Sequence, residues 1–253
     1  MAIKNKVVII TGASSGIGKA TALLLAESGA KIVLAARNQE KLEKAVNEIK
    51  ERNGEAVYKV TDVSKREEVK SLIDFTISKY GKIDVIFNNA GLMPNSPLSE
   101  FRTDEWDEMI DVNLKGVVNG IEAVLPHFIE QKSGHVISTS SVAGLNTYLG
   151  AGIYCATKHG VKALMEVLRK ESANEKRNIR TTTLYLGAFK TELAERITNK
   201  AIKDFIIHTE KIVLSIKYIQ EFIADYFKIK LEHLVSQKRN KQYAHPRQIA
   251  MYL

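Results

Sequence analysis

The sequence has a single cysteine, four prolines and six histidines among its 253 residues. One cysteine excludes a disulfide within the chain, and the histidines do not follow the HExxH or Cys/His spacings that hold a metal. No apolar run approaches the roughly 18 residues of a membrane span. The N-terminal stretch MAIKNKVVIITG has no signal-peptide cleavage pattern. We therefore expect a cytoplasmic protein without a bound metal or a membrane partner.

Acidic residues become scarce toward the end of the chain. The net charge is +8, with 37 Lys and Arg against 29 Asp and Glu. Residues 197–253 carry ten basic and five acidic side chains, so more than half of the excess lies in less than a quarter of the chain. Such a bias occurs in proteins that bind nucleic acid, although a solvated basic surface is the commoner explanation.

Short β-branched runs alternate with stretches of helical pattern through the first 190 residues. One such stretch is the charged segment from Gln39 to Arg52. This rhythm predicts an α/β fold of the Rossmann-like, doubly wound type, with a parallel sheet and helices on both faces. The length suits one large domain of this kind with an appendage. The predicted strands are Lys6–Thr11, Ile32–Ala35, Val57–Val60, Val85–Phe87, His135–Ser138 and Arg180–Tyr185.

The glycine-rich stretch TGASSGIG, residues 11–18, lies where the first predicted strand meets the first helix. Glycines let the backbone turn tightly and approach a pyrophosphate, while the helix N-terminus offers free N–H groups to its negative charge. Taken alone, the stretch also fits an ordinary turn between a strand and a helix. The candidate cofactor contacts are Gly12, Ser14, Ser15, Gly16, Ile17 and Gly18.

The TGxxxGxG spacing resembles the glycine motif of the short-chain dehydrogenases/reductases. Motifs in the right order are far more specific than any one of them, and residues 1–196 are identified as a domain of this family. The resemblance implies an oxidoreductase that interconverts a small carbonyl compound and an alcohol with a nicotinamide cofactor, and it implies a homo-oligomer. The other matching motifs are Asn88-Asn-Ala-Gly91, Asn113 within DVNLKG, Ser141, and the YxxxK pair of Tyr154 and Lys158.

The resemblance assigns a role to each of four residues. Tyr154 is the candidate acid/base, because the substrate oxygen gains or loses a proton as the hydride moves. Its phenol has an ordinary pKa near 10, so work at neutral pH needs a shift of about three units. Lys158, on the same helix face, and an oxidised nicotinamide would supply the positive charge that lowers this pKa. Ser141 would donate a hydrogen bond to the substrate oxygen, and Asn113 would hold a water that links Lys158 to solvent.

Each assignment has an ordinary alternative. A tyrosine and a lysine four residues apart on a helix are usually a packing pair, and Ser141 lies in STSS, where a serine can simply cap a helix. We expect Cys155 to be a small buried residue that fills space in the core. His159 lies away from the Tyr–Lys face, so we assign His159 no role.

The end of the second predicted strand bears on cofactor choice. An acidic residue there would bind the ribose 2′-hydroxyl of NAD, whereas an arginine can pair with the 2′-phosphate of NADP. Ala36 and Arg37 occupy this place, so NADP(H) is favoured; NAD(H) stays possible if Arg37 is only a surface residue. By resemblance, Asp62 and Val63 would flank the adenine, Asn88 and Ala90 the ribose side, and Thr191 the nicotinamide carboxamide. The other cofactor contacts implied by the resemblance are Gly91, Lys158 and Gly187.

The family pattern breaks after the sixth predicted strand. Leu186 replaces the proline of the usual Pro-Gly, although Gly187 and Thr191 are kept. Beyond Arg196 we do not find the expected final strand, which puts the homo-oligomer in doubt, and residues 197–213 read as a junction or a substrate lid. The residues that could line a modest apolar substrate pocket are Met93, Pro94, Tyr148 and Leu186.

Residues 214–253 form an atypical helical segment that resembles a different protein. Ser215 is a plausible N-cap, and an apolar stripe follows at helical spacing. The run resembles the start of the DNA-binding domain of the bacterial replication initiator DnaA, and it stops before the recognition helix. A chimera, a rearranged gene or a designed sequence would each explain it. The stripe consists of Ile219, Phe222, Ile223 and Tyr226.

Two functions therefore compete. The first is an NADP(H)-dependent carbonyl reductase or alcohol dehydrogenase, which the complete set of four catalytic motifs favours. The alternative is a weak or inactive reductase scaffold that carries a basic fragment for DNA. For that fragment we expect weak binding without sequence preference at most.

Overall fold

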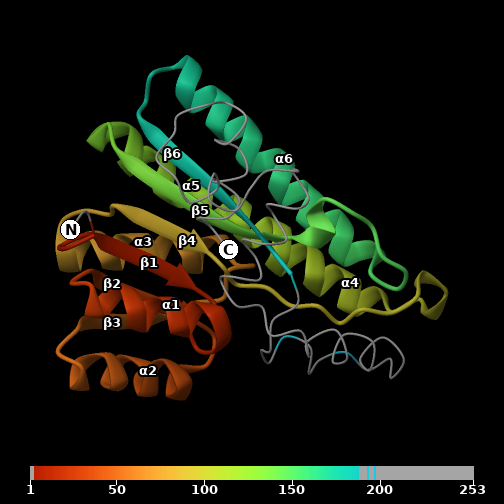
Figure 1. The fold of residues 1–253 in the computed structure, drawn as a ribbon, viewed down its shortest axis with the longest axis horizontal. Coiled ribbons are helices and arrows are strands. Elements are labelled where there is room, and N and C mark those ends of the chain that lie inside the picture. The colour runs from red at the N-terminus through yellow and green to blue at the C-terminus, as the bar shows by residue number, and fades with distance from the viewer. Residues whose placement is uncertain (1–2, 188–192, 194–196, 198–253) are drawn as a thin grey trace, which may run out of the picture. The chain divides into compact units, whose positions relative to one another are not determined.

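The computed structural model describes residues 3–187, Leu193 and Ile197, and it contains all six predicted strands (Figure 1). The strands pair in parallel to form one sheet of order β3-β2-β1-β4-β5-β6. The prediction of a doubly wound parallel sheet is confirmed. The strands are β1 (Val7–Thr11), β2 (Lys31–Ala36), β3 (Glu55–Val60), β4 (Val85–Asn88), β5 (Gly134–Ser141) and β6 (Ile179–Leu186).

Helices connect successive strands, as parallel pairing requires. The predicted charged helix begins at Gln39, where the Asn38 side chain accepts a hydrogen bond from the Lys41 N–H at 2.9 Å and so satisfies a free helix donor. The α-helices are α1 (Gly16–Glu27), α2 (Gln39–Glu51), α3 (Arg66–Tyr80), α4 (Thr103–Ile110), α5 (Gly116–Gln131) and α6 (Gly152–Asn174). Shorter turns are η1 (Leu98–Glu100), the π-helical η2 (Asp111–Lys115) and η3 (Val142–Gly144).

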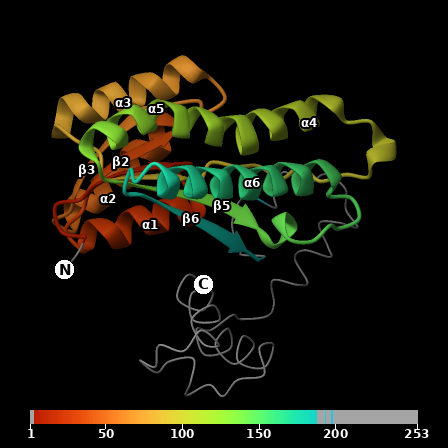
Figure 2. The same ribbon diagram turned by 90° about the horizontal axis from the view of Figure 1, so that it is seen from above.

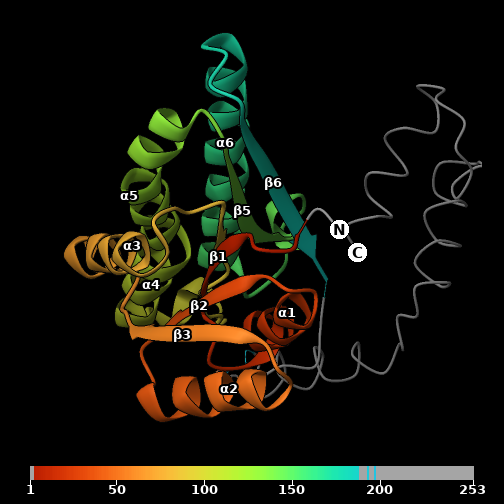
Figure 3. The ribbon, with the colours of Figure 1, turned by 90° about the vertical axis from the view of Figure 1, so that its left-hand side faces the viewer.

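Alternate residues of the buried strands supply two cores, one on each face of the sheet. In β1, Val8 and Ile10 pack with the apolar sides of α1 and α2, whereas Ile9 between them packs with α3, α5 and α6. Figures 2 and 3 show α1 and α3 on opposite sides of the sheet. Because both faces are covered at the centre of the sheet, β1 is buried along its whole length, which explains why it reads VVIIT.

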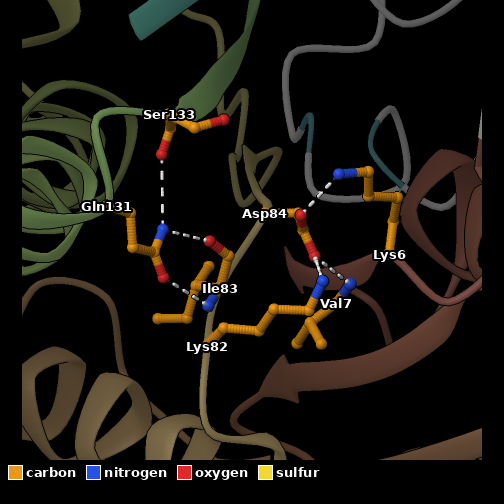
Figure 4. Close-up of polar contacts among 7 residues, drawn as sticks. All are labelled: Lys6, Val7, Lys82, Ile83, Asp84, Gln131 and Ser133. Carbon is orange, nitrogen blue, oxygen red and sulfur yellow. Dashed lines mark hydrogen bonds and ion pairs between the residues drawn. The ribbon is translucent and has the colours of Figure 1, made fainter. Parts of the chain in front are cut away.

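The Asp84 carboxylate fixes the amino-terminal end of the sheet (Figure 4). It accepts hydrogen bonds from the Val7 backbone N–H at 2.9 Å and from the Lys6 ammonium at 2.7 Å, and it pairs with Lys82 at 2.8 Å. Burial raises the pKa of Asp84, but these three donors outweigh it and hold the pKa below its ordinary value. The contacts join the start of β1 to the start of β4.

The Gln131 side chain makes a second junction at the same end of the sheet (Figure 4). Its amide nitrogen donates to the Ile83 carbonyl at 2.9 Å and to the Ser133 carbonyl at 3.3 Å, and its oxygen accepts from the Ile83 N–H at 3.3 Å. The end of α5 is thereby tied to the segment that leads into β4. The amino-terminal ends of the strands are thus occupied by structural contacts, and a binding site is expected at their carboxyl ends.

β6 is the edge of the sheet within the described residues, and six of its eight residues are only half-buried. Leu184 contacts the core on the α1 side without being buried in it. The expected loss of the final strand, the junction at 197–213 apart from Ile197, and the fragment at 214–253 lie outside the described residues. In the part of the chain that is described, none of the helices is long and apolar enough to cross a membrane.

Candidate active site

The candidate residues converge at the carboxyl ends of β1, β4 and β5. These three strands are neighbours in the sheet, and the chain changes direction of winding between β1 and β4. Doubly wound sheets bind ligands at this switch point, because the loops that follow the two strands diverge there.

The turn between β1 and α1 is packed closely against the loop after β4. Gly12 has a φ of +64°, and a Cβ atom at this position would lie 2.8 Å from the Cα of Ala90. A Cβ at Gly18 would overlap the carbonyl of Gly12. Both positions therefore need glycine, and the N-terminal turn of α1 has no acidic side chain that would repel an anion.

Asn89 ties the three central strands together, and sequence reasoning did not single it out. Its amide nitrogen lies 3.2 Å from the Thr11 carbonyl and 3.4 Å from that of Gly12, and its oxygen accepts from the Thr139 hydroxyl at 3.2 Å. The Thr11 hydroxyl accepts from the backbone N–H groups of Asn89 and Ala90. The second asparagine of the NNAG motif thus holds the glycine turn in place.

The first asparagine of that motif, Asn88, turns away from the glycine turn. It is buried, its amide nitrogen lies 3.4 Å from the Ser138 hydroxyl, and a Cβ at Gly120 would overlap its oxygen. A ribose contact by Asn88 would therefore have to use its backbone. Alternation of side chains along a strand could have signalled that Asn88 and Asn89 point in opposite directions.

The four expected catalytic residues lie together and are buried. Lys158 and Tyr154 come from α6, with the ammonium 5.6 Å from the centre of the phenol ring, and their residues are 3% and 7% exposed. Ser141 ends β5, and Asn113 lies in η2. The ammonium donates to the carbonyl of Thr139, on β5, at 2.9 Å. The family resemblance predicted this convergence.

Gly91 leaves room for that convergence. A Cβ atom at Gly91 would lie 3.2 Å from the Asn113 side-chain oxygen and 3.7 Å from the Lys158 ammonium nitrogen. The loop after β4 therefore packs directly against two of the expected catalytic side chains, and a Cβ at this position would crowd Asn113 and merely touch Lys158.

Burial governs the protonation of the Tyr–Lys pair. It lowers the pKa of Lys158 to about 8. It also raises the pKa of Tyr154, although the Ser141 hydroxyl lowers that pKa in part. We expected a lowered pKa for Tyr154, so the protein groups act in the opposite direction: desolvation of the phenolate outweighs its stabilisation.

Ser141 makes two further contacts besides the contact with Tyr154. Its hydroxyl donates to the Leu186 carbonyl at 3.1 Å and accepts from the Ala143 N–H at 3.1 Å, which caps η3. The capping alternative for this serine is thus part of the observed geometry. Leu186, where the family has proline, lies directly beside it.

Asn113 lies where the helix widens into a π turn, and its side chain is almost fully engaged. Its amide oxygen accepts from the Leu92 N–H at 2.9 Å, and its nitrogen donates to the Leu92 carbonyl at 2.9 Å and to the Thr157 hydroxyl at 3.4 Å. The side chain therefore fixes the loop after β4, and it has little capacity left for a water.

The adenosine end of the expected site is more exposed. The Arg37 side chain, directly after β2, is 60% exposed and pairs with Glu108 of α4 at 3.5 Å. Glu108 was not predicted, because no local pattern links it to β2. The Asp62 carboxylate accepts from the N–H and hydroxyl of Ser64 at 3.0 and 2.7 Å, which fixes the loop after β3.

Val63, expected beside the adenine, is held in place by two residues of α5. The Asn119 amide nitrogen donates to the Val63 carbonyl at 2.8 Å, and a Cβ at Gly116 would lie 2.7 Å from the Val63 side chain. The sequence did not indicate this role of Asn119, because the contact joins residues 56 positions apart in the chain.

The remaining predicted residues are placed as follows. Cys155 is buried, as expected for a filler, and the His159 ring hydrogen-bonds the Cys155 carbonyl at 2.9 Å. Met93 packs with the cluster around Tyr154, and Pro94 is buried. Ser14, Ser15 and Ile17 are half-buried, Gly16 is exposed with a φ of +52°, and Gly187 is exposed, whereas Thr191 lies outside the described residues.

Comparison with sequence families gives two matches on this chain. The sequence model described as "short chain dehydrogenase" matches residues 6–202. The model described as "Bacterial dnaA protein helix-turn-helix" matches residues 216–253. Both resemblances identified from the sequence are confirmed.

Curated relatives cover the first of these regions. An uncharacterized oxidoreductase of Listeria monocytogenes is 66% identical over 200 residues, which cover 79% of this chain and 81% of the relative. An uncharacterized oxidoreductase of Staphylococcus saprophyticus is 50% identical over 204 residues, covering 81% and 82%.

Solved structures share the fold. A short-chain dehydrogenase/reductase from Burkholderia phymatum in complex with NAD superimposes with a TM-score of 0.75 at 29% identity, over 100% of this chain and 80% of that chain. An alcohol dehydrogenase from Thermococcus sibiricus complexed with 5-hydroxy-NADP gives 0.71 at 32% identity, over 81% and 88%.

Proposed function

Because the chain belongs to the short-chain dehydrogenase family, we propose that it interconverts a small carbonyl compound and an alcohol by hydride transfer with NADP(H). The observation that carries the proposal is the buried group of Asn113, Ser141, Tyr154 and Lys158 at the carboxyl ends of the central strands. A buried ammonium beside a buried phenol is unfavourable for stability alone, and such groups are typical of functional sites.

The described residues fit a dinucleotide. The glycine turn after β1 and the free N–H groups of α1 suit a pyrophosphate, and the Asp62–Val63 loop borders the place of the adenosine. When bound, a nicotinamide cofactor supplies or accepts the hydride. Everything else in the reaction is proton transfer, orientation and exclusion of water by the protein's own residues.

Tyr154 acts as the acid in carbonyl reduction. Its raised pKa keeps the phenol protonated at neutral pH, so a proton is available for the substrate oxygen. Lys158, with a pKa of about 8, stays largely charged at neutral pH and stabilises the phenolate that forms. In the oxidation direction the phenol must ionise first, and the positive charge of an oxidised nicotinamide would then add to that of Lys158.

Ser141 orients and stabilises the substrate oxygen. A hydroxyl has one proton, and in the structure Ser141 donates it to the Leu186 carbonyl. On substrate binding, the hydroxyl would rotate its proton from Leu186 to the substrate oxygen. This exchange needs only a rotation about one bond.

Asn113 acts mainly through the backbone it shapes. Because its amide is bonded to both backbone groups of Leu92, the water relay to Lys158 would use the Asn113 carbonyl in the π turn. Helix carbonyls are free where the regular hydrogen-bond pattern is interrupted.

NADP(H) is the proposed cofactor because Arg37 follows β2 without an acidic residue beside it. The solved structures were obtained with NAD in one case and an NADP analogue in another. The substrate proposed is a modest apolar carbonyl compound, since Met93 packs against the cluster around Tyr154 and the next residue, Pro94, is apolar and buried.

The test is a panel of aldehydes, ketones and hydroxy acids assayed with NADPH and NADH. We expect reduction of at least one apolar carbonyl compound with NADPH preferred. Turnover with neither cofactor across the panel would refute the enzyme assignment.

Binding to DNA is a second, weaker candidate function, and the match of residues 216–253 to a DNA-binding family is the observation that favours it. The alternative of an inactive scaffold is not favoured, because the dehydrogenase match contains the full catalytic set. Four basic residues near the end of the chain would neutralise about four phosphates at most, so log K should fall with log salt with a slope no steeper than about −3.6. These residues are Lys238, Arg239, Lys241 and Arg247.

Titration of the full chain with initiator-site and scrambled duplexes at two salt concentrations tests this. We expect equal affinities, because phosphate contacts carry no sequence information. A preference above about tenfold for the initiator site, or about 1.4 kcal/mol, would show base reading.

A further inference from the structure

Glu108 lies beside the arginine to which the proposed function assigns the 2′-phosphate. Its carboxylate oxygen is 3.5 Å from a terminal guanidinium nitrogen of Arg37. Arg37 follows β2 and Glu108 belongs to α4, so the fold brings the pair together from distant segments. An incoming 2′-phosphate would therefore compete with the Glu108 carboxylate for the Arg37 guanidinium.

The helix that carries Glu108 packs at the adenosine end. The next residue, Met109, and Val112 one turn later pack in one cluster with Val63. Val63 is held in place through its carbonyl by Asn119. The segment from α4 to α5 thus borders the expected adenine position, and Glu108 brings a negative charge to its edge.

The charge acts oppositely on the two cofactors. A phosphate monoester carries between one and two negative charges near neutral pH and binds an arginine best through two parallel hydrogen bonds. Glu108 competes for those donors and repels the phosphate. NAD has a neutral hydroxyl at this place, which a carboxylate does not repel and to which it can offer an acceptor.

We infer that Glu108 is a cofactor-specificity residue that weakens the preference for NADP(H) over NAD(H). This rests on the proposed function, specifically on Arg37 as the group that binds the 2′-phosphate. Arg37 and Glu108 together make the site tolerant of both cofactors: the arginine attracts the phosphate, and the carboxylate limits the gain.

The effect is modest, because both side chains are partly in solvent, at 60% and 32% exposure. Pairs of this kind interact weakly, so removing the charge should change the preference about two- to fivefold. Salt screens exposed charges over a Debye length of about 10 Å at 0.1 M and about 3 Å at 1 M, so the change should be smaller at high salt.

The experiment compares Glu108→Gln with wild type in the full chain. The quantity measured is the ratio of kcat/KM with NADPH to kcat/KM with NADH, at low salt and at 1 M salt. The matched control is Glu166→Gln, which removes the carboxylate of another exposed Arg–Glu pair, with Arg169 at 2.8 Å on α6. We expect the ratio to rise about two- to fivefold in Glu108→Gln alone, and to rise less at 1 M salt.

Glu108→Asp separates charge from packing. It keeps the negative charge, so its ratio should stay closer to wild type than that of Glu108→Gln. An unchanged or lowered ratio in Glu108→Gln, or an equal rise in the control, overturns the inference.

Arg37→Leu distinguishes this failure from failure of the proposed function. If Arg37→Leu lowers the ratio while Glu108→Gln leaves it unchanged, the cofactor proposal stands and the inference about Glu108 is wrong. If Arg37→Leu also leaves the ratio unchanged, the assignment of Arg37 to the phosphate is itself wrong.

Discussion

The two ends of the proposed cofactor site are built in different ways. At the catalytic end, Tyr154 and Lys158 are 7% and 3% exposed, and the ammonium is fixed by the Thr139 carbonyl. At the adenosine end, Arg37 and Glu108 are paired at 3.5 Å, and both side chains are partly exposed to solvent. Electrostatic effects are large where water is excluded and small where it is present. Turnover should therefore depend steeply on single groups, whereas cofactor choice should be easy to adjust.

The largest expected effect comes from Tyr154→Phe. Removal of the phenol oxygen should lower kcat by about 100- to 10,000-fold, the range of a positioned acid–base group, and leave NADPH affinity nearly unchanged. The control is Tyr58→Phe. It removes a hydroxyl on β3 that donates a hydrogen bond to the Glu43 carboxylate of α2 at 2.6 Å, and it should keep wild-type kcat. A Tyr154→Phe enzyme with more than about a tenth of wild-type activity would contradict the assignment.

The glycine turn between the two ends should show the next largest effect, which we expect in the free energy of unfolding. Gly12→Ala adds a Cβ 2.8 Å from the Cα of Ala90 at a φ of +64°, so both strain and overlap destabilise the protein. Gly81→Ala is the matched control, because its φ is +73° but no atom lies within 4 Å. We expect a loss of about 1 kcal/mol in the free energy of unfolding for Gly81→Ala and about 1–3 kcal/mol more for Gly12→Ala. Urea unfolding measures both, and equal losses would show that the turn is not tightly packed.

The pKa of Lys158, about 8, predicts opposite pH dependences for activity and stability. Above about pH 8 the buried ammonium loses its proton, so kcat/KM for carbonyl reduction should fall about tenfold per pH unit. The unfolded chain keeps this proton to about pH 10.4, so between these values it binds more protons than the folded chain. The contribution of Lys158 to the free energy of unfolding should therefore rise with pH in this window.

A pH–rate profile and urea unfolding at matched pH values check the two trends. A kcat/KM for reduction that stays constant to pH 10 would show that the charge of Lys158 is not required. Lys158→Met should remove the rise in stability above pH 8, since it has no proton to lose.

The smallest of these effects is expected at the adenosine end. Ala36→Asp with Arg37→Leu should lower the NADPH-to-NADH ratio of kcat/KM by about tenfold, because the new carboxylate repels the 2′-phosphate and accepts from the ribose hydroxyl. Arg169→Leu, which removes another exposed arginine, is the control and should leave the ratio unchanged. If the double variant changes kcat more than it changes the ratio, the two ends are not independent.

The sequence predicted the fold well because its signals are local. The strands are short runs rich in β-branched residues between helical stretches, and all six formed within two residues of the expected bounds except at the end of β5. There the structure extends the strand from Ser138 to Ser141, through STSS, because these residues pair with β6. A strand segment made of polar residues lacks the hydrophobic pattern from which strands are predicted.

The convergence of the four expected catalytic residues was also predictable, because they match the motifs of a known family in the right order, although they lie on three elements. The rest of the site was not, because it depends on contacts between distant segments. Asn89 and Glu108 act through side chains that meet other strands or helices, and Ser141 finds the Leu186 carbonyl on β6. The raised pKa of Tyr154 follows from burial, which no motif reports.

Consumption of reduced cofactor by the full chain tests the central claim most directly. Wild type and Tyr154→Phe would be assayed with NADPH and with NADH against the carbonyl panel, following the absorbance of the reduced nicotinamide. We expect wild type to consume NADPH faster than NADH with at least one apolar carbonyl compound, and Tyr154→Phe to lose both activities while keeping cofactor affinity. Equal turnover by the two proteins, or a loss of cofactor affinity that accounts for the whole decrease in Tyr154→Phe, would contradict the central claim.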